Sequence, residues 1–245
     1  NNTKEIILSG INVGDFGRNN NESFIDLLNE INKQTDIQRI RISSIEPNLI
    51  NDEIIELISS NKKFMPHLHI PLQSGSNPIL RKMKRKYTVE MYKDKINKIK
   101  NKIEGCTIGV DIMTGFPGET EECFNDTYSL LNDLPISYLH VFPFSERENT
   151  LAYKMEDKID LEIRYVRAKI LRKLSQLKFR QVQQKNINCT RPVLFEMNEN
   201  GFVSGLTDNY IRVKVPQDKT GRSNFISNVT LVDINDGIMI GEIVQ

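Results

Sequence analysis

The stretch Thr107-Ile-Gly-Val-Asp-Ile-Met113 runs directly into Thr114-Gly-Phe-Pro-Gly-Glu-Thr120, and residues 121–132 follow it. The first segment is apolar and rich in β-branched residues, which predicts a buried strand. The second segment is a glycine-rich loop that ends on Thr120, a residue type favoured at helix N-caps. Acidic residues then occupy the first turn of the third segment, where the helix dipole favours them. Together these segments predict one strand–loop–helix unit.

The same alternation recurs along the first 144 residues. Strands are predicted at residues 5–9, 38–45, 68–72, 107–113 and 138–144. Helices are expected to begin after Ser23, Asn51, Thr88 and Thr120, and Ser23 and Asp26 are spaced as in a capping box. Strands that alternate with helices predict an α/β fold with parallel strands. Because five units are fewer than the eight of a complete barrel, we expect a partial, TIM-like (β/α) barrel.

Residues 158–187 predict one long amphipathic helix. Its expected apolar face follows three- and four-residue steps through Ile163, Val166, Ile170, Leu174 and Leu177. The expected opposite face is basic and holds Arg164, Arg167, Lys169, Arg172, Lys173, Lys178 and Arg180.

After residue 188 the pattern changes to short apolar runs at residues 192–196, 201–204, 210–215, 229–232 and 240–244, divided by Gly, Asn and Asp turns. This pattern predicts a small antiparallel barrel. We therefore expect a partial core at residues 1–153, a basic connecting helix at 154–188 and a β-barrel at 189–245.

The composition is that of an ordinary globular protein, with 38% hydrophobic and 27% charged residues. No apolar run reaches the ~18 residues that span a bilayer, so we expect a soluble protein without membrane contact. We also expect it to be cytoplasmic and monomeric. The net charge of +1 is unevenly distributed, because residues 154–189 carry 10 basic and 4 acidic side chains.

Cys106, Cys123 and Cys189 lie 17 and 66 positions apart, which matches no zinc or iron–sulfur spacing. We expect three reduced thiols.

Polar or glycine-rich loops follow all five predicted strands, at residues 9–17, 43–48, 71–76, 114–120 and 145–150. The carboxyl ends of parallel strands meet at one edge, so the five loops predict a site on a shared rim. Gln73 and Ser74 can hydrogen-bond ribose hydroxyls, and Gly115 and Gly118 let the backbone approach a flat ligand such as adenine.

Three carboxylates near the same rim, Glu46, Asp111 and Glu119, could pair with an ammonium group. Two alternatives remain open. Asp111 could instead be a satisfied polar residue inside the barrel, and Glu119 could instead interact with the dipole of the helix that it precedes.

His67 and His69 are two residues apart and therefore share one face of a strand. Metal binding is possible, but no third ligand is visible nearby in the sequence, so we expect no metal site. His140 is expected to pack inside the barrel.

Arg81-Lys-Met-Lys-Arg-Lys86 places five basic residues in six. The segment could be a solvated helix end, or it could be a patch that contacts phosphates and that the basic helix would reinforce.

Six motifs follow one another along the chain: Gly10-Ile-Asn-Val-Gly-Asp-Phe-Gly17, Arg39-Ile-Arg-Ile-Ser-Ser-Ile-Glu-Pro47, His67-Leu-His-Ile-Pro-Leu-Gln-Ser-Gly-Ser76, Met83-Lys-Arg85, Gly109-Val-Asp-Ile-Met-Thr-Gly-Phe-Pro-Gly-Glu-Thr120 and Leu139-His-Val-Phe-Pro-Phe-Ser-Glu-Arg-Glu-Asn-Thr150. Together they resemble the radical S-adenosylmethionine (SAM) methylthiotransferases. The final barrel resembles the TRAM domain, an OB-like RNA-binding module. Residues 12–15 and 145–150 resemble the branch that acts on threonylcarbamoyladenosine in tRNA. Other branches usually carry Ser-Pro before a Gly-Thr at the second place.

The resemblance implies that a 4Fe–4S cluster reductively cleaves SAM and that the resulting radical abstracts the hydrogen from C2 of the modified adenosine beside the anticodon. It also implies that a second 4Fe–4S cluster supplies the sulfur and a second SAM the methyl group. It implies cofactor contacts at Gly10, Asn12, Glu46, Gln73, Ser74, Asp111, Gly115 and the backbone around Phe142. It implies that Ser145, Glu146, Arg147 and Asn149 face the nucleoside. The basic residues Arg81, Lys82, Lys84 and Arg85 would contact the tRNA.

The chain departs from this family in its cysteines. It has neither the Cys-x-x-x-Cys-x-x-Cys loop nor the three further cysteines of the family's amino-terminal domain. We therefore expect a fragment that begins after the first core strand and helix, holds neither cluster, contains no catalytic residue and is inactive alone. The alternatives are a methylthiotransferase for isopentenyladenosine tRNA, a non-catalytic RNA-binding module and a natural relative without clusters.

Overall fold

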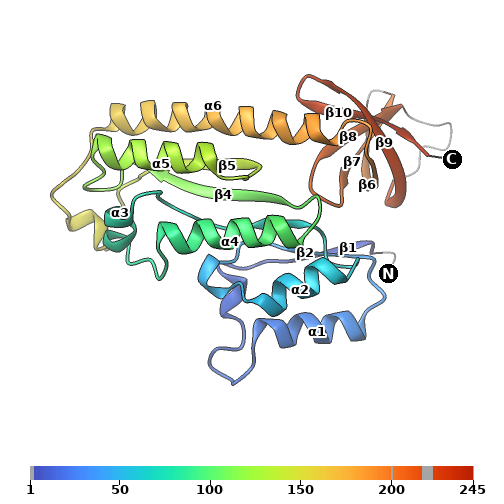
Figure 1. Cartoon of the computed structure of the whole chain (residues 1–245), viewed down its shortest axis with the longest axis horizontal. Helices are drawn as coiled ribbons and strands as arrows, with labels where there is room; N and C mark the ends of the chain where they lie inside the picture. Colours follow the sequence, from blue (N-terminus) through green and yellow to red (C-terminus); the bar gives the residue numbers. More distant parts are fainter. Residues whose placement is uncertain (1–2, 200, 217–222, 245) are drawn as a thin grey trace.

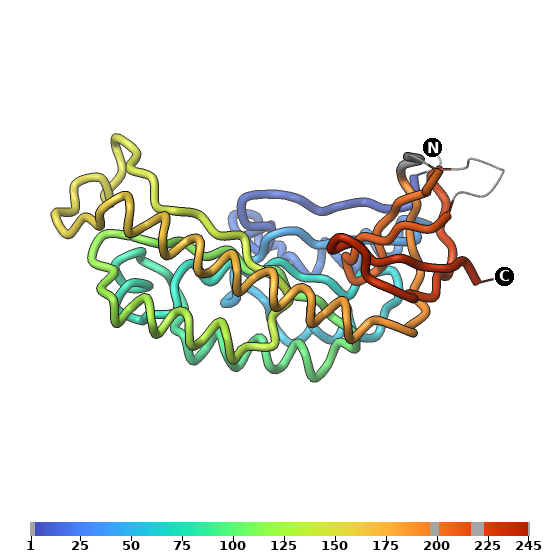
Figure 2. Tube along the Cα trace, turned by 90° about the horizontal axis from the view of Figure 1, so that it is seen from above, coloured from blue at the N-terminus to red at the C-terminus, as the bar shows by residue number. Residues whose placement is uncertain are grey.

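In the computed structural model, residues 3–199, 201–216 and 223–244 are described, so residues 1–2 of the predicted core and residues 200, 217–222 and 245 of the predicted barrel lie outside these ranges. The chain forms an α/β part and a closed β-barrel, and the long helix α6 (Leu161–Asn186) connects them (Figure 1). Seen from above, α6 runs from the loops that follow the last α/β strand to the barrel (Figure 2).

The α/β part alternates strands and helices as the sequence predicts. In chain order it contains β1 (Glu5–Leu8), α1 (Phe24–Gln34), β2 (Arg39–Ile42), α2 (Asp52–Ser60), β3 (His67–His69), α3 (Asn77–Lys82), α4 (Val89–Lys102), β4 (Thr107–Thr114), α5 (Glu121–Asp133) and β5 (Tyr138–Pro143), with short 3-10 turns at Val13–Asp15, Pro47–Leu49 and Ala152–Lys154. Strand β1 pairs with β2, and β3, β4 and β5 form a second sheet; every pair is parallel. Parallel bridges from Ile40 to Phe64 and from Ser44 to His69 connect the two sheets. An α/β fold with parallel strands is therefore confirmed.

The expected helix starts are confirmed by their capping bonds. The side chains of Ser23, Asn51, Thr88 and Thr120 each accept a hydrogen bond from a backbone N–H of the first turn. Ser23 and Asp26 form the complete capping box. Each such cap satisfies a backbone donor that the helix itself leaves unpaired, which stabilises the helix by about 1 kcal/mol.

The third strand is shorter than predicted and lies earlier in the chain. It ends at His69, and the segment to Ser76 touches the sheet again through one bridge, from Gln73 to Ile112. Pro71 has no N–H to donate to a sheet, and Gln73 has a φ of 68°, which regular strands exclude. The apolar run at residues 68–72 is buried, but most of it is not strand.

The long helix is confirmed, but its predicted faces are wrong. Of the expected apolar stripe, only Leu174 is buried, whereas Leu177 is 61% exposed. The exposed side also holds the rest of that stripe: Ile163, Val166 and Ile170. The buried side instead contains Ala168 and Leu171 together with the basic residues Arg164, Arg167 and Lys178.

These three buried basic residues have polar partners on the neighbouring elements. Arg164 Nη1 donates to Phe144 O (3.0 Å), and Lys178 Nζ donates to Leu134 O (2.7 Å). Arg167 Nη1 donates to a carboxylate oxygen of Glu119 (2.9 Å). Their aliphatic stems fill the apolar layer while their charged ends satisfy buried acceptors, which hydrophobic periodicity does not reveal.

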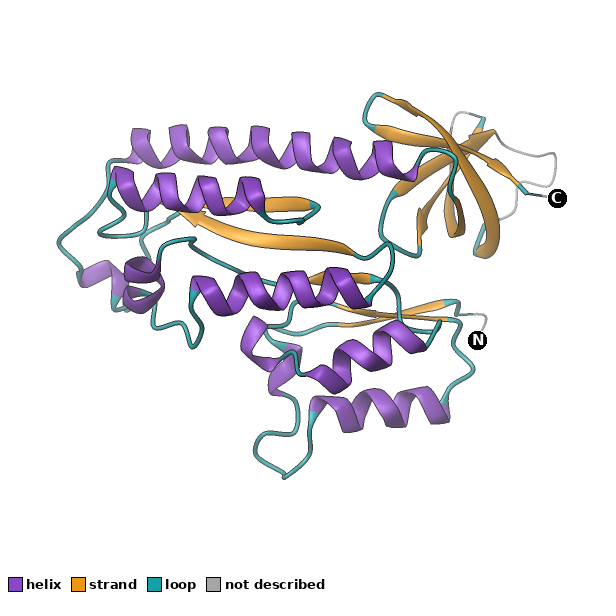
Figure 3. Ribbon diagram, viewed as in Figure 1, coloured by secondary structure: helices purple, strands orange, loops and turns teal. Residues whose placement is uncertain are grey.

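The carboxyl-terminal strands close into a five-stranded barrel in the order β10-β8-β7-β6-β9. The strands are β6 (Thr190–Glu199), β7 (Phe202–Thr207), β8 (Arg212–Pro216), β9 (Phe225–Asn235) and β10 (Ile238–Ile243). The predicted barrel is confirmed, but the prediction of purely antiparallel pairing is wrong, because β8 and β10 pair in parallel. A ring with an odd number of strands cannot alternate direction throughout, so one pair must run parallel. Figure 3 shows the barrel beside the end of α6.

The turn between β7 and β8 fastens the barrel to the amino-terminal ends of the α/β strands. Arg39 of β2 donates from Nη2 to Thr207 O (2.9 Å), and Arg41 donates from Nη1 to Asp208 O (3.2 Å). Thr107, at the start of β4, donates from its hydroxyl to the backbone oxygen of the next turn residue, Asn209 (2.6 Å). Side chains from two α/β strands thus hold three successive carbonyls of one turn, which places the barrel opposite the rim.

Exchanging Arg167 for leucine tests the buried ion pair. Both Arg167 and Glu119 are buried, so the variant leaves a buried carboxylate without its cation and should lower the free energy of unfolding by about 3–5 kcal/mol. The matched variant Lys82→Leu breaks the exposed pair with Asp157 and should cost about 1 kcal/mol or less. Urea unfolding followed by circular dichroism measures both. Equal losses in the two variants would contradict the structural role assigned to Arg167.

Candidate functional site

The loops after β1 and β2 meet at the carboxyl ends of the strands. Val13 N donates to Ser44 O (3.2 Å), and Glu46 N donates to Asn12 Oδ1 (3.2 Å). The Glu46 carboxylate accepts a hydrogen bond from Arg85 Nη1 (2.8 Å), which follows α3. The structure therefore brings Asn12, Glu46 and Arg85 together, and Gly10 lies exposed just before them.

The loop after β3 holds its polar residues more tightly. Gln73 O accepts a hydrogen bond from Met113 N (2.9 Å), which joins this loop to β4. Ser74 is only 2% exposed, and its hydroxyl accepts from Ser76 N (3.2 Å). Thr127 of α5 accepts from Gly75 N (3.0 Å) and so fixes the loop from behind.

The loop after β4 is built around Gly115 and Glu119. Gly115 has a φ of 72°, its N–H donates to Glu119 Oε2 (2.7 Å), and a Cβ at this position would lie 2.2 Å from Arg164 Cγ. Burial raises the pKa of Glu119, and its hydrogen bonds with Gly115 and Arg167 oppose that shift. Because both its oxygens are engaged inside the protein, Glu119 holds this loop together and is not free for an ammonium group.

The loop after β5 combines one fixed carboxylate with exposed polar residues. Glu146 accepts hydrogen bonds from Lys158 Nζ (2.8 Å) and Arg164 Nη2 (2.9 Å), and these bonds, that of Lys158 first, lower the pKa of Glu146. Ser145, Arg147 and Asn149 are exposed. On the strand before the loop, Phe142 is 50% exposed.

The basic segment at residues 81–86 is only partly free. Lys82 Nζ lies 3.0 Å from Asp157 Oδ2, and Arg85 is the partner of Glu46. Arg81, Lys84 and Lys86 are exposed, and none of them makes an ion pair within the described parts of the chain. We expected the basic helix α6 to reinforce this patch. That expectation is wrong for Arg164, Arg167 and Lys178, because these three side chains are buried.

A second group of polar side chains lines the face of the strands that the helices do not cover, which we call the lumen. His69 Nε2 lies 2.9 Å from Asp111 Oδ1, and His140 Nδ1 lies 3.6 Å from the same oxygen. The expectation that His140 packs inside the barrel is wrong in one respect: the residue lies on this wall, but 52% of its side chain is exposed. Burial, followed by the nearby His69, lowers the pKa of His140.

His67 lies on the same face but has different partners. Its Nε2 lies 2.8 Å from the Tyr138 hydroxyl, and its ring stacks on Tyr210 of the barrel, with ring centroids 4.2 Å apart. Burial lowers the pKa of His67 well below its usual value. The sequence suggested His67 and His69 as a pair; the structure separates them and joins His69 to Asp111 and His140. The two-residue alternation along residues 107–113 and 138–144 was the signal that could have found this group.

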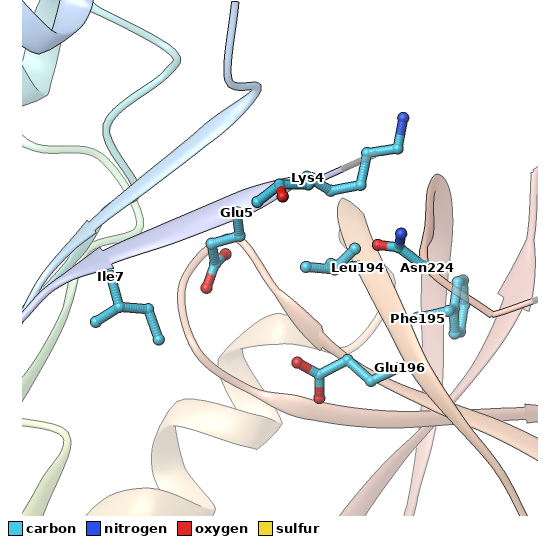
Figure 4. A pocket seen from close by; sticks show the side chains of 8 residues that line it. Lys4, Glu5, Ile7, Leu194, Phe195, Glu196 and Asn224 are labelled. Carbon is cyan, nitrogen blue, oxygen red and sulfur yellow. The ribbon is translucent and has the colours of Figure 1, made fainter. Parts of the chain in front are cut away.

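A cleft of about 580 Å³ lies between β1 and the barrel, at the end opposite the rim. Glu5 and Ile7 of β1 and Leu194, Phe195 and Glu196 of β6 are among the residues that line it (Figure 4). Its place at the amino-terminal ends of the strands separates it from the rim loops.

The sequence model of the Radical SAM superfamily matches residues 2–131, which are more than half of the chain. The chain belongs to the radical SAM superfamily. Among solved structures, coproporphyrinogen III oxidase (HemN) from Escherichia coli, a radical SAM enzyme, matches with a TM-score of 0.54 at 13% identity, over 94% of this chain and 60% of that one. That likeness supports the fold.

Two curated relatives that this chain resembles are named as enzymes that add a methylthio group to tRNA. The threonylcarbamoyladenosine tRNA methylthiotransferase MtaB of Bacillus subtilis is 41% identical over 229 residues, which cover 89% of this chain and 51% of that protein. The tRNA-2-methylthio-N(6)-dimethylallyladenosine synthase of Finegoldia magna is 32% identical over 247 residues, which cover 99% and 53%. The family resemblance predicted from the motifs is confirmed. The chain spans about half the length of the curated relatives that it matches.

The cysteines of this radical SAM chain do not fit an iron–sulfur cluster. Cys106 is buried before β4, and burial raises the pKa of its thiol to about 12, which disfavours a thiolate ligand. Cys123 lies in the first turn of α5, and Cys189 is exposed between α6 and β6. Within the described residues, no three cysteines come close enough to share a metal.

In the same part of the chain, no helix is both long and apolar enough to cross a membrane.

The rim does fit a polar ligand such as SAM. Three buried polar atoms at or near it, Asn48 Oδ1, Ser76 Oγ and Arg85 Nε, have no hydrogen-bond partner among the described residues. Buried polar atoms without a partner cost about 1–3 kcal/mol each, so a ligand that pairs with them gains that energy.

Exchanging Gly115 for alanine tests how tightly the rim is built. The variant must adopt a left-handed conformation and also displace Arg164, whereas Gly237→Ala, at φ 76°, meets nothing within 4 Å. We expect Gly237→Ala to cost about 1–2 kcal/mol of unfolding free energy and Gly115→Ala at least about 1 kcal/mol more. Chemical denaturation of both variants measures the difference. Equal costs would mean that Arg164 moves aside freely.

Proposed function

We propose that the chain works as part of a tRNA methylthiotransferase that modifies threonylcarbamoyladenosine beside the anticodon. The 41% identity to the Bacillus subtilis relative over most of this chain is the observation that carries the proposal. The motif at residues 145–150 supports the choice of nucleoside. We propose that the protein acts in the cytoplasm, because its proposed substrate is tRNA, and that it acts as a monomer.

In this proposal the rim binds SAM, which when bound supplies the radical-forming and methyl-donating chemistry. Gly115 makes room for the Arg164 side chain and so keeps the loop after β4 in place, and the exposed ring of Phe142 offers a stacking face for adenine. The polar contacts come from the loops that meet there: Gly10, Asn12, Glu46, Gln73 and Ser74. Asp111 lies on the lumen wall instead. Because the cysteines here fit no cluster, the iron–sulfur clusters would be held outside this chain.

The substrate side of the proposal rests on the loop after β5. Ser145, Arg147 and Asn149 are exposed beside Phe142, so they can reach a nucleoside that approaches from the rim. Glu146 is held in place by Arg164 and Lys158, so it can present a fixed carboxylate edge. We propose that the closed β-barrel is a TRAM-like module that contacts the tRNA, although its side chains carry no excess of positive charge.

A second candidate function is RNA binding without catalysis by this chain. The exposed Arg81, Lys84 and Lys86 favour it, because none of them has a carboxylate partner in the described part of the chain and all three are available to phosphates. The two candidates are distinguishable, since only the first requires chemistry at the nucleoside.

The proposed activity can be measured on the full-length protein reconstituted with iron and sulfide without oxygen. We expect methylthio product on tRNA that carries threonylcarbamoyladenosine, detected by nucleoside mass spectrometry. Arg147→Ala should lower kcat/KM by about tenfold or more, whereas Glu148→Ala in the same loop should change it little. Product only on isopentenyladenosine tRNA would overturn the substrate assignment, and no product on either would overturn the activity.

The basic segment can be tested by titrating tRNA into this chain at several salt concentrations. The logarithm of the affinity should fall linearly with the logarithm of the salt concentration. Arg81→Ala and Lys84→Ala should each weaken binding and lower the slope by about one, whereas Lys82→Ala, whose ammonium pairs with Asp157, should do less. Salt-independent binding, or equal effects of the three variants, would count against a phosphate contact here.

A further inference from the structure

Three side chains on the lumen wall come from three adjacent parallel strands. His69 ends β3, Asp111 lies on β4 and His140 lies on β5. Asp111 and His140 are partners in the strand register, and His69 is the partner of Gly109, two residues before Asp111. Because alternate residues of a strand share a face, all three side chains point to the same side of the sheet. Gly109 has no side chain to separate them.

The backbone under this group is fixed on both sides. His69 O accepts a hydrogen bond from Ile45 N (3.1 Å), and Asp111 O accepts from Leu72 N (3.1 Å) and Gln73 N (2.9 Å). The residues between them on the strands, such as Val110 and Val141, are buried in the main core. The three side chains therefore project from a rigid wall, which suits a site whose ligands must keep their geometry.

The ligand atoms are spaced closely enough to hold one ion. One atom from each of His69, Asp111 and His140 lies within 4.8 Å of the others. Two ligands of one tetrahedral metal with bonds of about 2.0–2.2 Å lie about 3.3–3.6 Å apart. The His69–Asp111 and His140–Asp111 distances of 2.9 and 3.6 Å bracket that range. The His140 side chain is 52% exposed, so the ligand atoms are open to an ion that enters from the lumen.

The charges at this group also favour a cation. The ion-pair partners of Asp111 are the two histidines, and no arginine or lysine pairs with it within the described chain. A carboxylate and two imidazoles form a ligand set that divalent transition metals prefer. By contrast, His67 is 4% exposed and is occupied by Tyr138 and Tyr210, so it does not belong to the set.

We propose that His69, Asp111 and His140 bind one divalent transition-metal ion, of the class of Zn²⁺ or Fe²⁺, on the lumen wall. With three protein ligands, the ion keeps at least one position toward the lumen, where water or a polar atom of a bound molecule would complete its coordination. This site is separate from any iron–sulfur cluster, since it uses no cysteine, and it does not depend on the proposed methylthiotransferase activity.

Titration of this chain with ZnCl₂ by calorimetry, and with CoCl₂ by visible absorption, tests the proposal. All titrations use a reference protein that carries Cys123→Ser and Cys189→Ser, because these are the two thiols that are not fully buried and could bind zinc themselves. We expect one ion per chain. His69→Ala, Asp111→Asn and His140→Ala should each weaken Zn²⁺ binding by at least about tenfold, while His67→Gln should leave it within about twofold. Circular dichroism of each variant checks that it folds.

Nuclear magnetic resonance of the imidazole nitrogens gives a second readout without any substitution. The chain has three histidines, so each ring can be followed. Saturable Zn²⁺-induced shifts at His69 and His140, but not at His67, are expected. No saturable shift, shifts confined to His67, or binding that survives all three ligand variants would overturn the proposal.

Discussion

The in-register parallel pairing of β3, β4 and β5 is the constraint on which the rest of the α/β part depends. It sets which side of each strand faces the helices. On β4 the side chains of Ile108, Val110 and Ile112 enter the core, so Gly109 and Asp111 must face the lumen. Core and lumen are two faces of one sheet, and a slip of one residue would exchange them. The apolar packing that stabilises the fold therefore also positions the polar side chains that give it chemistry.

Part of the positive charge of the connecting helix is structural. Arg164 and Arg167 lie under the loops after β4 and β5 and hold them through Phe144 O, Glu146 and Glu119. These are two of the five rim loops, so the geometry proposed for cofactor binding rests in part on buried arginines of α6. A planar guanidinium with five donors can hold several acceptors at once, which explains why arginine occupies both positions.

The barrel and the α/β part are joined through backbone carbonyls of a single turn. Arg39, Arg41 and Thr107 hold Thr207, Asp208 and Asn209, and the His67 ring stacks on Tyr210 next to them. This junction occupies the amino-terminal ends of the strands, so a ligand for the lumen would approach from the rim or the open side. An RNA bound by the barrel would thus be held at the opposite end from the loops proposed to face the nucleoside, and a molecule as long as tRNA could span both.

The sequence by itself determined the strand–helix alternation, the helix starts at Ser23, Asn51, Thr88 and Thr120, the small barrel and the family, because caps, periodicity and long motifs are local signals. Only the tertiary structure decided which face of α6 is buried, because Arg164, Arg167 and Lys178 find their acceptors on elements far away in the chain. It also decided where β3 ends, and that one barrel pair runs parallel. The grouping of His69 with Asp111 and His140, rather than with His67, likewise depends on strand register. The two-residue alternation along each strand indicates which side chains share a face, but which strands pair, and in which register, depends on residues far apart in the chain.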